Sequence, residues 1–170
     1  MVHRSIYHLD LDKFVQPEPA LSLGYMIIRS PQVVDLEELA RLMLDAYKGT
    51  IDEDGKTYED TLNEVRAYFA GERGGLARED CSKVYELRRK LVSACLVAEW
   101  TERQIPIIVY VMTLAEMKRQ GLARSLLFTT LRSLRDLEYS EVQAVITDGD
   151  TPSEQLFAQF GFKRVDRSVG

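Results

Sequence analysis

The stretch VYVMTLAEMKRQGLARSLLFTTL, residues 109–131, decides the fold. Its β-branched start predicts a strand over residues 109–113, and the regular leucines after Gly121 predict an amphipathic helix. Between them lies a basic loop of the form Lys118-x-x-Gly121-x-Ala123. The first N–H groups of a helix lack intrahelical partners, and a glycine lets an anion approach the backbone closely. The pattern predicts either an anion-binding turn or an ordinary turn between strand and helix.

Composition limits the class of protein. The chain has 170 residues, 45% hydrophobic and 29% charged, which indicates one globular domain. Its net charge of −5 argues against a nucleic-acid or anionic-membrane partner. No apolar run approaches the roughly 20 residues of a membrane span. The N-terminus has acidic residues where a signal peptide needs an apolar core, so we expect a cytoplasmic protein. We expect it to be a monomer or a homodimer.

Neither the cysteines nor the histidines form a metal-binding pattern. Cys81 and Cys95 make no CxxC motif, and His3 and His8 have no further ligand in register nearby. We therefore expect no metal site and two reduced thiols.

The remaining chain alternates short β-rich runs with amphipathic segments. Asp35 is expected to cap the first helix, with Glu38 as its capping-box partner. Residues 1–24, broken by prolines, are expected to form an N-terminal arm with at most one short strand, and residues 25–170 a single domain. The expected order is β-α-α-β-β-β-α-β-α-β, which predicts an α/β (α+β) class with a mixed sheet. The expected strands are 25–29, 84–87, 91–100, 106–113, 142–147 and 162–165, and the expected helices 35–47, 57–71, 122–137 and 151–159.

Two segments together resemble the GNAT superfamily of N-acetyltransferases. The first, VMTLAEMKRQGLARSLL (residues 111–127), is similar to the family's pyrophosphate loop, commonly Arg/Gln-x-x-Gly-x-Gly/Ala. The second, VITDGDTPSEQLFAQFGFKRV (residues 145–165), is similar to its closing strand–helix–strand segment. The resemblance covers roughly residues 25–167. It implies a three-layer fold with a central mixed β-sheet and helices on both faces.

The resemblance also implies acetyl-CoA as co-substrate. In the family, backbone amides of the loop hold the pyrophosphate, and the preceding strand pairs with the pantetheine arm. Lys118 stands where Arg or Gln is usual, which keeps a donor but loses the planar fork. The implied cofactor-binding residues are Val111, Met112, Thr113, Lys118, Arg119, Gln120, Gly121, Leu122, Ala123, Arg124, Ser125 and Phe157.

The usual catalytic side chains of the family are absent. The tyrosine that often protonates the leaving thiolate corresponds to Phe157, which cannot donate a proton. The positions of two family general bases fall on Ile107 and Val145. The substitutes are Tyr110, Glu99 and Asp148, with Asp150 nearby. Each also fits a plain role: a core or rim tyrosine, a surface carboxylate at a strand end, and turn-forming aspartates.

The sequence therefore predicts an acetyl-CoA-dependent N-acetyltransferase, an acyltransferase that acts by direct transfer to a primary amine. The acceptor would be a small amine, a polyamine or a peptide N-terminus. The acidic loop at residues 52–54 and the negative net charge favour a small amine or polyamine, although such a loop is usually only solvated. The alternative is a non-catalytic acyl-CoA-binding or regulatory module of the same fold. A domain that binds some other phosphate-bearing ligand would leave the second segment unexplained.

Overall fold

One eight-stranded mixed sheet forms the centre of the molecule in the computed structural model, which describes residues 3–19 and 25–165. The strand order is β2-β4-β5-β6-β7-β1-β8, and β3 adds to β5. The β6–β7 pair is parallel, whereas the other paired strands are antiparallel. The strands are β1 (Arg4–Asp10), β2 (Met26–Arg29), β3 (Leu76–Ala77), β4 (Lys83–Leu87), β5 (Lys90–Trp100), β6 (Ile105–Thr113), β7 (Glu141–Thr147) and β8 (Lys163–Arg164).

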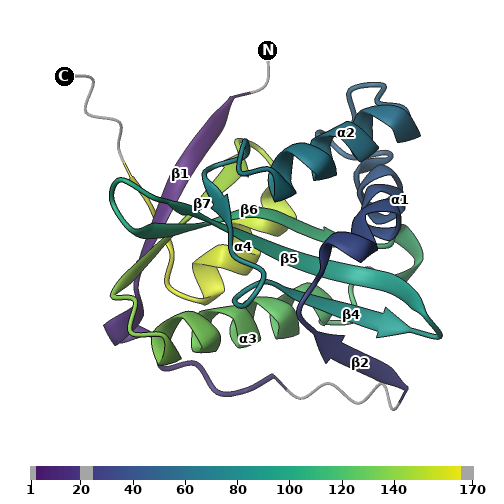
Figure 1. Ribbon diagram of the computed structural model, residues 1–170. Coiled ribbons are helices and arrows are strands. Elements are labelled where there is room, and N and C mark those ends of the chain that lie inside the picture. The colour runs from purple at the N-terminus through teal and green to yellow at the C-terminus, as the bar shows by residue number, and fades with distance from the viewer. Residues whose placement is uncertain (1–2, 20–24, 166–170) are drawn as a thin grey trace.

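Helices cover both faces of this sheet, as Figure 1 shows. On one face, α1 (Leu36–Tyr47) and α2 (Tyr58–Phe69) bury a core against β4, β5 and β6. On the other, α3 (Leu122–Asp136) and α4 (Thr151–Gln159) bury a second core together with the N-terminal segment. Because β5 lies between the two cores, its residues 91–98 are all buried, which explains their unbroken apolar run. The predicted three-layer α/β class is confirmed.

The start of α1 differs from the prediction in one detail. Asp35 precedes the helix but makes no side-chain capping bond to it. Both carboxylate oxygens accept from the Arg29 guanidinium at 2.8 Å, and one also accepts from the Gln32 N–H. The expected capping box with Glu38 is therefore wrong. The Asp35 oxygens that would have capped α1 are bonded to Arg29 of β2 and to Gln32 instead.

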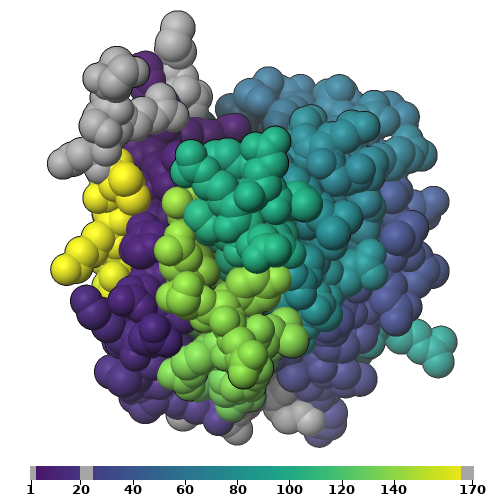
Figure 2. All heavy atoms as spheres, turned by 60° about the vertical axis from the view of Figure 1, so that its left-hand side comes forward, coloured from purple at the N-terminus to yellow at the C-terminus, as the bar shows by residue number. Residues whose placement is uncertain are grey.

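The N-terminal segment contributes a full strand to the sheet. All seven residues of β1 pair with β7, from Arg4 opposite Thr147 to Asp10 opposite Glu141, and β8 pairs with its other edge. In Figure 2 the purple N-terminal segment lies between the yellow β8 and the light-green chain around the start of β7. Phe14 then packs against Phe128 of α3 and Phe160, with ring centroids 5.7 and 6.1 Å away. Residues 20–24 of the expected arm lie outside the described residues.

Within the described ranges, no helix is both long and apolar enough to cross a membrane.

Candidate active site

The site begins with two parallel strands that separate. β6 pairs with β5 along its whole length, but with β7 only at Ile107↔Gln143 and Ile108↔Ala144. Beyond these pairs, β6 continues to Thr113 and β7 to Thr147 without bonding to each other. The pairing of β5 with β6 is shifted at the same point, so that Val109 is the extra residue of a β-bulge. A gap therefore opens in the middle of the sheet and widens toward the carboxyl ends of both strands.

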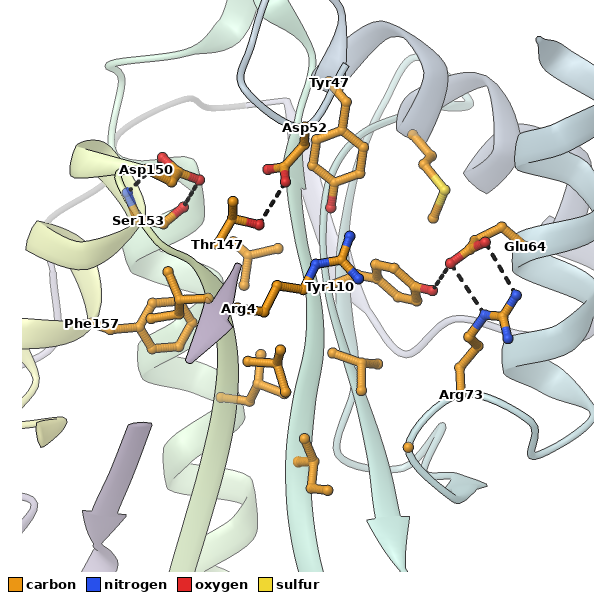
Figure 3. A pocket seen from close by; sticks show the side chains of 18 of the residues that line it. Arg4, Tyr47, Asp52, Glu64, Arg73, Tyr110, Thr147, Asp150, Ser153 and Phe157 are labelled. Carbon is orange, nitrogen blue, oxygen red and sulfur yellow. Dashed lines mark hydrogen bonds and ion pairs between the residues drawn. The ribbon is translucent and has the colours of Figure 1, made fainter. Parts of the chain in front are cut away.

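A cavity of about 530 Å³ occupies this gap. It extends from α1 and α2 on one face of the sheet to Phe157 of α4 on the other. Figure 3 shows its labelled side chains, which come from β1, α1, the α1–α2 loop, α2, the α2–β3 loop, β6, β7, the turn after β7 and α4. Its volume is that of a small-molecule site.

The turn that follows β6 presents free backbone donors. A short 3-10 helix, η3 (Ala115–Met117), leads to Arg119 and Gly121, whose φ angles are +66° and +84°. Gly121 is the N-cap of α3, and the first intrahelical bond runs from the Ser125 N–H to the Gly121 carbonyl at 3.0 Å. The three preceding N–H groups, of residues 122–124, have no helical carbonyl to bond and carry the positive end of the helix dipole. The predicted turn thus has the geometry of an anion-binding helix start.

Three side chains of this segment are engaged elsewhere, those of Lys118, Leu122 and Ser125. The Lys118 ammonium donates to the Ala46 carbonyl at the end of α1, 2.7 Å away. Leu122 is buried in the core, and the Ser125 hydroxyl pairs with that of Tyr85. Arg119, Gln120 and Arg124 are exposed, and Ala123 is half-buried. Contacts from this turn to a ligand therefore fall to its backbone and to its exposed basic side chains.

The predicted strand residues face different ways. Val111 lines the cavity, Met112 is buried beneath α1, and the Thr113 hydroxyl bonds to that of Ser93 at 2.8 Å. What the three share is a backbone edge that β7 leaves open.

Of the three predicted catalytic side chains, one lies at the cavity. Tyr110 lines it, and its hydroxyl donates to Glu64 Oε1 at 2.5 Å. Glu99 is outside the lining and accepts from the Arg78 guanidinium at 2.6 Å and from the Tyr139 hydroxyl at 3.1 Å. Asp148 is also outside and accepts from Ser5 at 2.6 Å. Asp150 lines the cavity while capping α4 through Ser153, and Phe157 closes the far end.

Some lining residues, among them Glu64 and Arg73, were not predicted from the sequence, whereas Asp52 belongs to the acidic loop that was considered for the amine. The Arg73 guanidinium bonds to both carboxylate oxygens of Glu64, at 3.2 and 3.3 Å. Asp52, in the acidic loop, accepts from the Thr147 hydroxyl at 2.7 Å. The helical spacing could have indicated two of the lining residues. Tyr47 lies four residues after the buried Met43, and Glu64 lies four residues before the buried Tyr68, so each shares a helix face with a buried residue.

The surroundings shift the proton affinities of this cluster. Burial would raise the pKa of Glu64, but the hydrogen bonds from Tyr110 and Arg73 outweigh it, and the pKa lies below its ordinary value. Burial, followed by the hydrogen bond to Glu64 and its charge, raises the pKa of Tyr110. At neutral pH the cavity therefore contains an ionised Glu64 and a neutral Tyr110 hydroxyl.

Solved structures share this architecture. A GCN5-related N-acetyltransferase from Sphaerobacter thermophilus superposes with a TM-score of 0.69 at 16% identity, over 95% of this chain but 48% of the other. A protein from Pyrococcus horikoshii matches with a TM-score of 0.66 at 19% identity, over 84% of this chain and 92% of its own. An aminoglycoside N-acetyltransferase in complex with CoA gives 0.62 at 13%, over 89% and 97%. At such identities the likeness shows the fold, and the chain spans about half the length of the Sphaerobacter protein.

The sequence itself carries the family assignment. Comparison with curated proteins finds no match. The family described as FR47-like protein, however, matches residues 84–169, a range that begins in β4 and includes α3 and α4. That range includes the separating strands, the turn at Gly121 and α4. The chain therefore belongs to the FR47-like family, within the GNAT superfamily of N-acetyltransferases.

Proposed function

We propose that this protein is an N-acetyltransferase that moves the acetyl group of acetyl-CoA directly to a primary amine. The observation that carries the proposal is the cavity in the β6–β7 gap. At the carboxyl end of β6 the chain supplies free helical N–H groups for a phosphate, and within the cavity it supplies titratable side chains for an amine. The CoA complex of the aminoglycoside acetyltransferase, a protein of the same fold, is consistent with this division.

Backbone groups would hold the cofactor. The N–H groups of residues 122–124 would bind the pyrophosphate, Arg119 and Arg124 would neutralise its charge from the surface, and Gln120 would add an uncharged donor. The open edge of β6 at Val111 to Thr113 would pair with the pantetheine amides, as an added strand pairs with a sheet edge.

The transfer forms a C–N bond and breaks the C–S bond of the thioester. The amine nitrogen attacks the thioester carbonyl carbon, the C–S bond breaks, the nitrogen loses a proton and the thiolate leaves. The Tyr110 hydroxyl lines the cavity and donates to Glu64, so its oxygen can still accept a hydrogen bond. The nitrogen becomes acidic once it has attacked. Tyr110 would accept its proton while passing its own to Glu64, which places a base in the cavity without a carboxylate on β6 or β7.

Cofactor binding and transfer are separately measurable. We expect calorimetry to show CoA and acetyl-CoA binding, and a thiol-release assay to show turnover that depends on an added primary amine. Absence of CoA binding at millimolar concentration would refute the cofactor assignment. Binding without thiol release across a panel of small amines, polyamines and peptides would refute the transferase.

Phe157 favours a second candidate, a non-catalytic acyl-CoA-binding module. Its ring is buried against Phe162, with centroids 5.0 Å apart, and it places a carbon edge at the end of the cavity where the family often has a tyrosine hydroxyl. The module predicts equal stabilisation by CoA and acetyl-CoA with no turnover. If Phe157→Tyr then gave acetyl-CoA-dependent thiol release, the lack of a proton donor at position 157 would explain why the wild-type protein shows no turnover.

A further inference from the structure

Equal numbers of acidic and basic side chains line the cavity, but not all of the basic ones have an ion-pair partner. Three acidic and three basic side chains line it: Asp52, Glu64, Asp150, Arg4, Lys56 and Arg73. Arg73 is paired with Glu64 at 3.2 Å, and Lys56 with Asp54 at 3.6 Å. Among the described residues, no carboxylate oxygen lies within 4.0 Å of the Arg4 guanidinium.

The backbone fixes where Arg4 lies. Arg4 is paired in register with Thr147 across β1 and β7, at the point where β7 borders the cavity. Figure 3 shows its side chain extending from β1 across the cavity toward the side where Tyr47 and Tyr110 lie. The nearby aspartates are held in place by other groups. Asp52 accepts from Thr147 at 2.7 Å, and Asp150 accepts from the Ser153 hydroxyl at 2.7 Å while capping α4.

A second donor faces the same space. Tyr47 lines the cavity from the end of α1, and its ring points into it in Figure 3. Within the part of the chain that the structure describes, the side-chain bond at Tyr47 runs from the Thr50 hydroxyl to the Tyr47 backbone carbonyl, and none involves the Tyr47 hydroxyl. Burial raises the pKa of Tyr47 and the charge of Asp52 raises it further, while Arg4 opposes them. The hydroxyl is therefore a neutral donor at neutral pH.

A free guanidinium beside a free hydroxyl is a binding arrangement for a carboxylate. Arg4 is exposed, and guanidinium groups bind carboxylates with two parallel, charge-assisted hydrogen bonds. The proposed CoA phosphates are placed elsewhere, at the start of α3, so the cofactor does not account for Arg4. The acceptor is the remaining ligand.

We propose that the acceptor is a small zwitterion, an amine that carries a carboxylate a few bonds away. Arg4 and Tyr47 bind the carboxylate, and Tyr110 with Glu64 receives the amine. This inference rests on the proposed transferase and narrows its acceptor. It favours a free amino-acid-like molecule over a polyamine, which has no anionic end, and over a simple alkylamine.

Matched acceptors test the inference. With acetyl-CoA fixed, ω-amino acids of two to five carbons are each compared with the amide of the same length. We expect kcat/KM to be roughly tenfold to a hundredfold higher for the best acid than for its amide, since a hydrogen bond to a charged group contributes about 1.5–3 kcal/mol. Arg4→Gln should remove this preference by raising KM for the acid alone, and CoA affinity should not change.

Arg66→Gln is the matched control. Arg66 is an exposed arginine of α2 outside the cavity lining, and its loss should leave the preference intact. Equal kcat/KM for acid and amide in the wild-type protein, or an unchanged preference in Arg4→Gln, would overturn the inference while leaving the transferase standing.

A binding measurement separates the two failures. If no acceptor releases thiol, the transferase proposal fails, and the acids and amides are then titrated into the CoA-saturated protein by calorimetry. Acid binding that depends on Arg4 would support the carboxylate site on its own. Equal binding of acid and amide, or none, would overturn it.

Discussion

The two ends of the site are built from different materials. At the start of α3, the proposed phosphate site consists of backbone N–H groups from one short turn, and several side chains there are buried or engaged elsewhere. At the acceptor end, the cavity consists of side chains from β1, α1, the α1–α2 loop, α2 and α4. A backbone site tolerates changes of side chain but needs a particular φ angle. A side-chain site tolerates backbone variation but needs particular functional groups.

The largest effect should come from the backbone end. Gly121→Val places a β-branched residue at φ +84°, where an L-residue is strained, and adds methyl groups beside the free N–H donors. Losing two charge-assisted hydrogen bonds of about 2 kcal/mol each would weaken CoA binding roughly a thousandfold. Isothermal titration calorimetry with CoA measures this change in the dissociation constant. Gly49→Val, at φ +76° with no atom within 4 Å of the added carbon, carries similar strain away from the turn and should keep CoA affinity. Equal loss in both variants would mean that strain alone is responsible.

A smaller effect, confined to turnover, should come from the side-chain end. Tyr110→Phe removes the hydroxyl that donates to Glu64 at 2.5 Å, and general acid–base catalysis contributes about a hundredfold or more. We expect kcat to fall about a hundredfold while the CoA dissociation constant stays the same. Tyr139→Phe, which removes a hydroxyl paired with Glu99 outside the cavity, is the control. A full rate in Tyr110→Phe would exclude the relay.

The smallest effect should be on stability. Asp35→Asn breaks the pair with Arg29 that anchors the start of α1 and should cost about 1–3 kcal/mol at pH 7. Burial favours protonation of Asp35, but the hydrogen bonds from Arg29 and Gln32 dominate and lower its pKa. Because the folded-state pKa is lowered, this stabilisation is present above the unfolded pKa of about 3.9 and is lost as pH falls through the folded pKa.

Urea unfolding at a series of pH values tests this prediction. The difference between wild type and Asp35→Asn should shrink below about pH 4. Since α1 carries Tyr47, the variant should alter acceptor KM more than CoA affinity. A constant difference down to pH 2 would contradict the role of the Arg29 pair.

The same contrast explains what could be predicted from sequence. Strand and helix order followed from periodicity, and the Gly121 turn was found because its parts are contiguous. At the acceptor end, Tyr110 and the acidic loop with Asp52 were named from the sequence, but Arg4 and Glu64 were missed because they are distant in sequence and meet the others only through tertiary packing. Glu99 looked like a base at a strand end, but Arg78 and Tyr139 hold it outside the cavity, and no local pattern reveals that pairing.

The place of β1 in the sheet has a consequence for how the molecule is made. Ser5 and Asp148, which bond across β1 and the end of β7, are separated by 143 positions in the chain. Such distant pairing closes late, because a long loop must be ordered before the contact forms. During synthesis, β1 emerges first yet must wait for β7, while β4, β5 and β6 can already pair with one another. We therefore expect the β4–β5–β6 part of the sheet to form before the wall that carries Arg4, which must wait for β7.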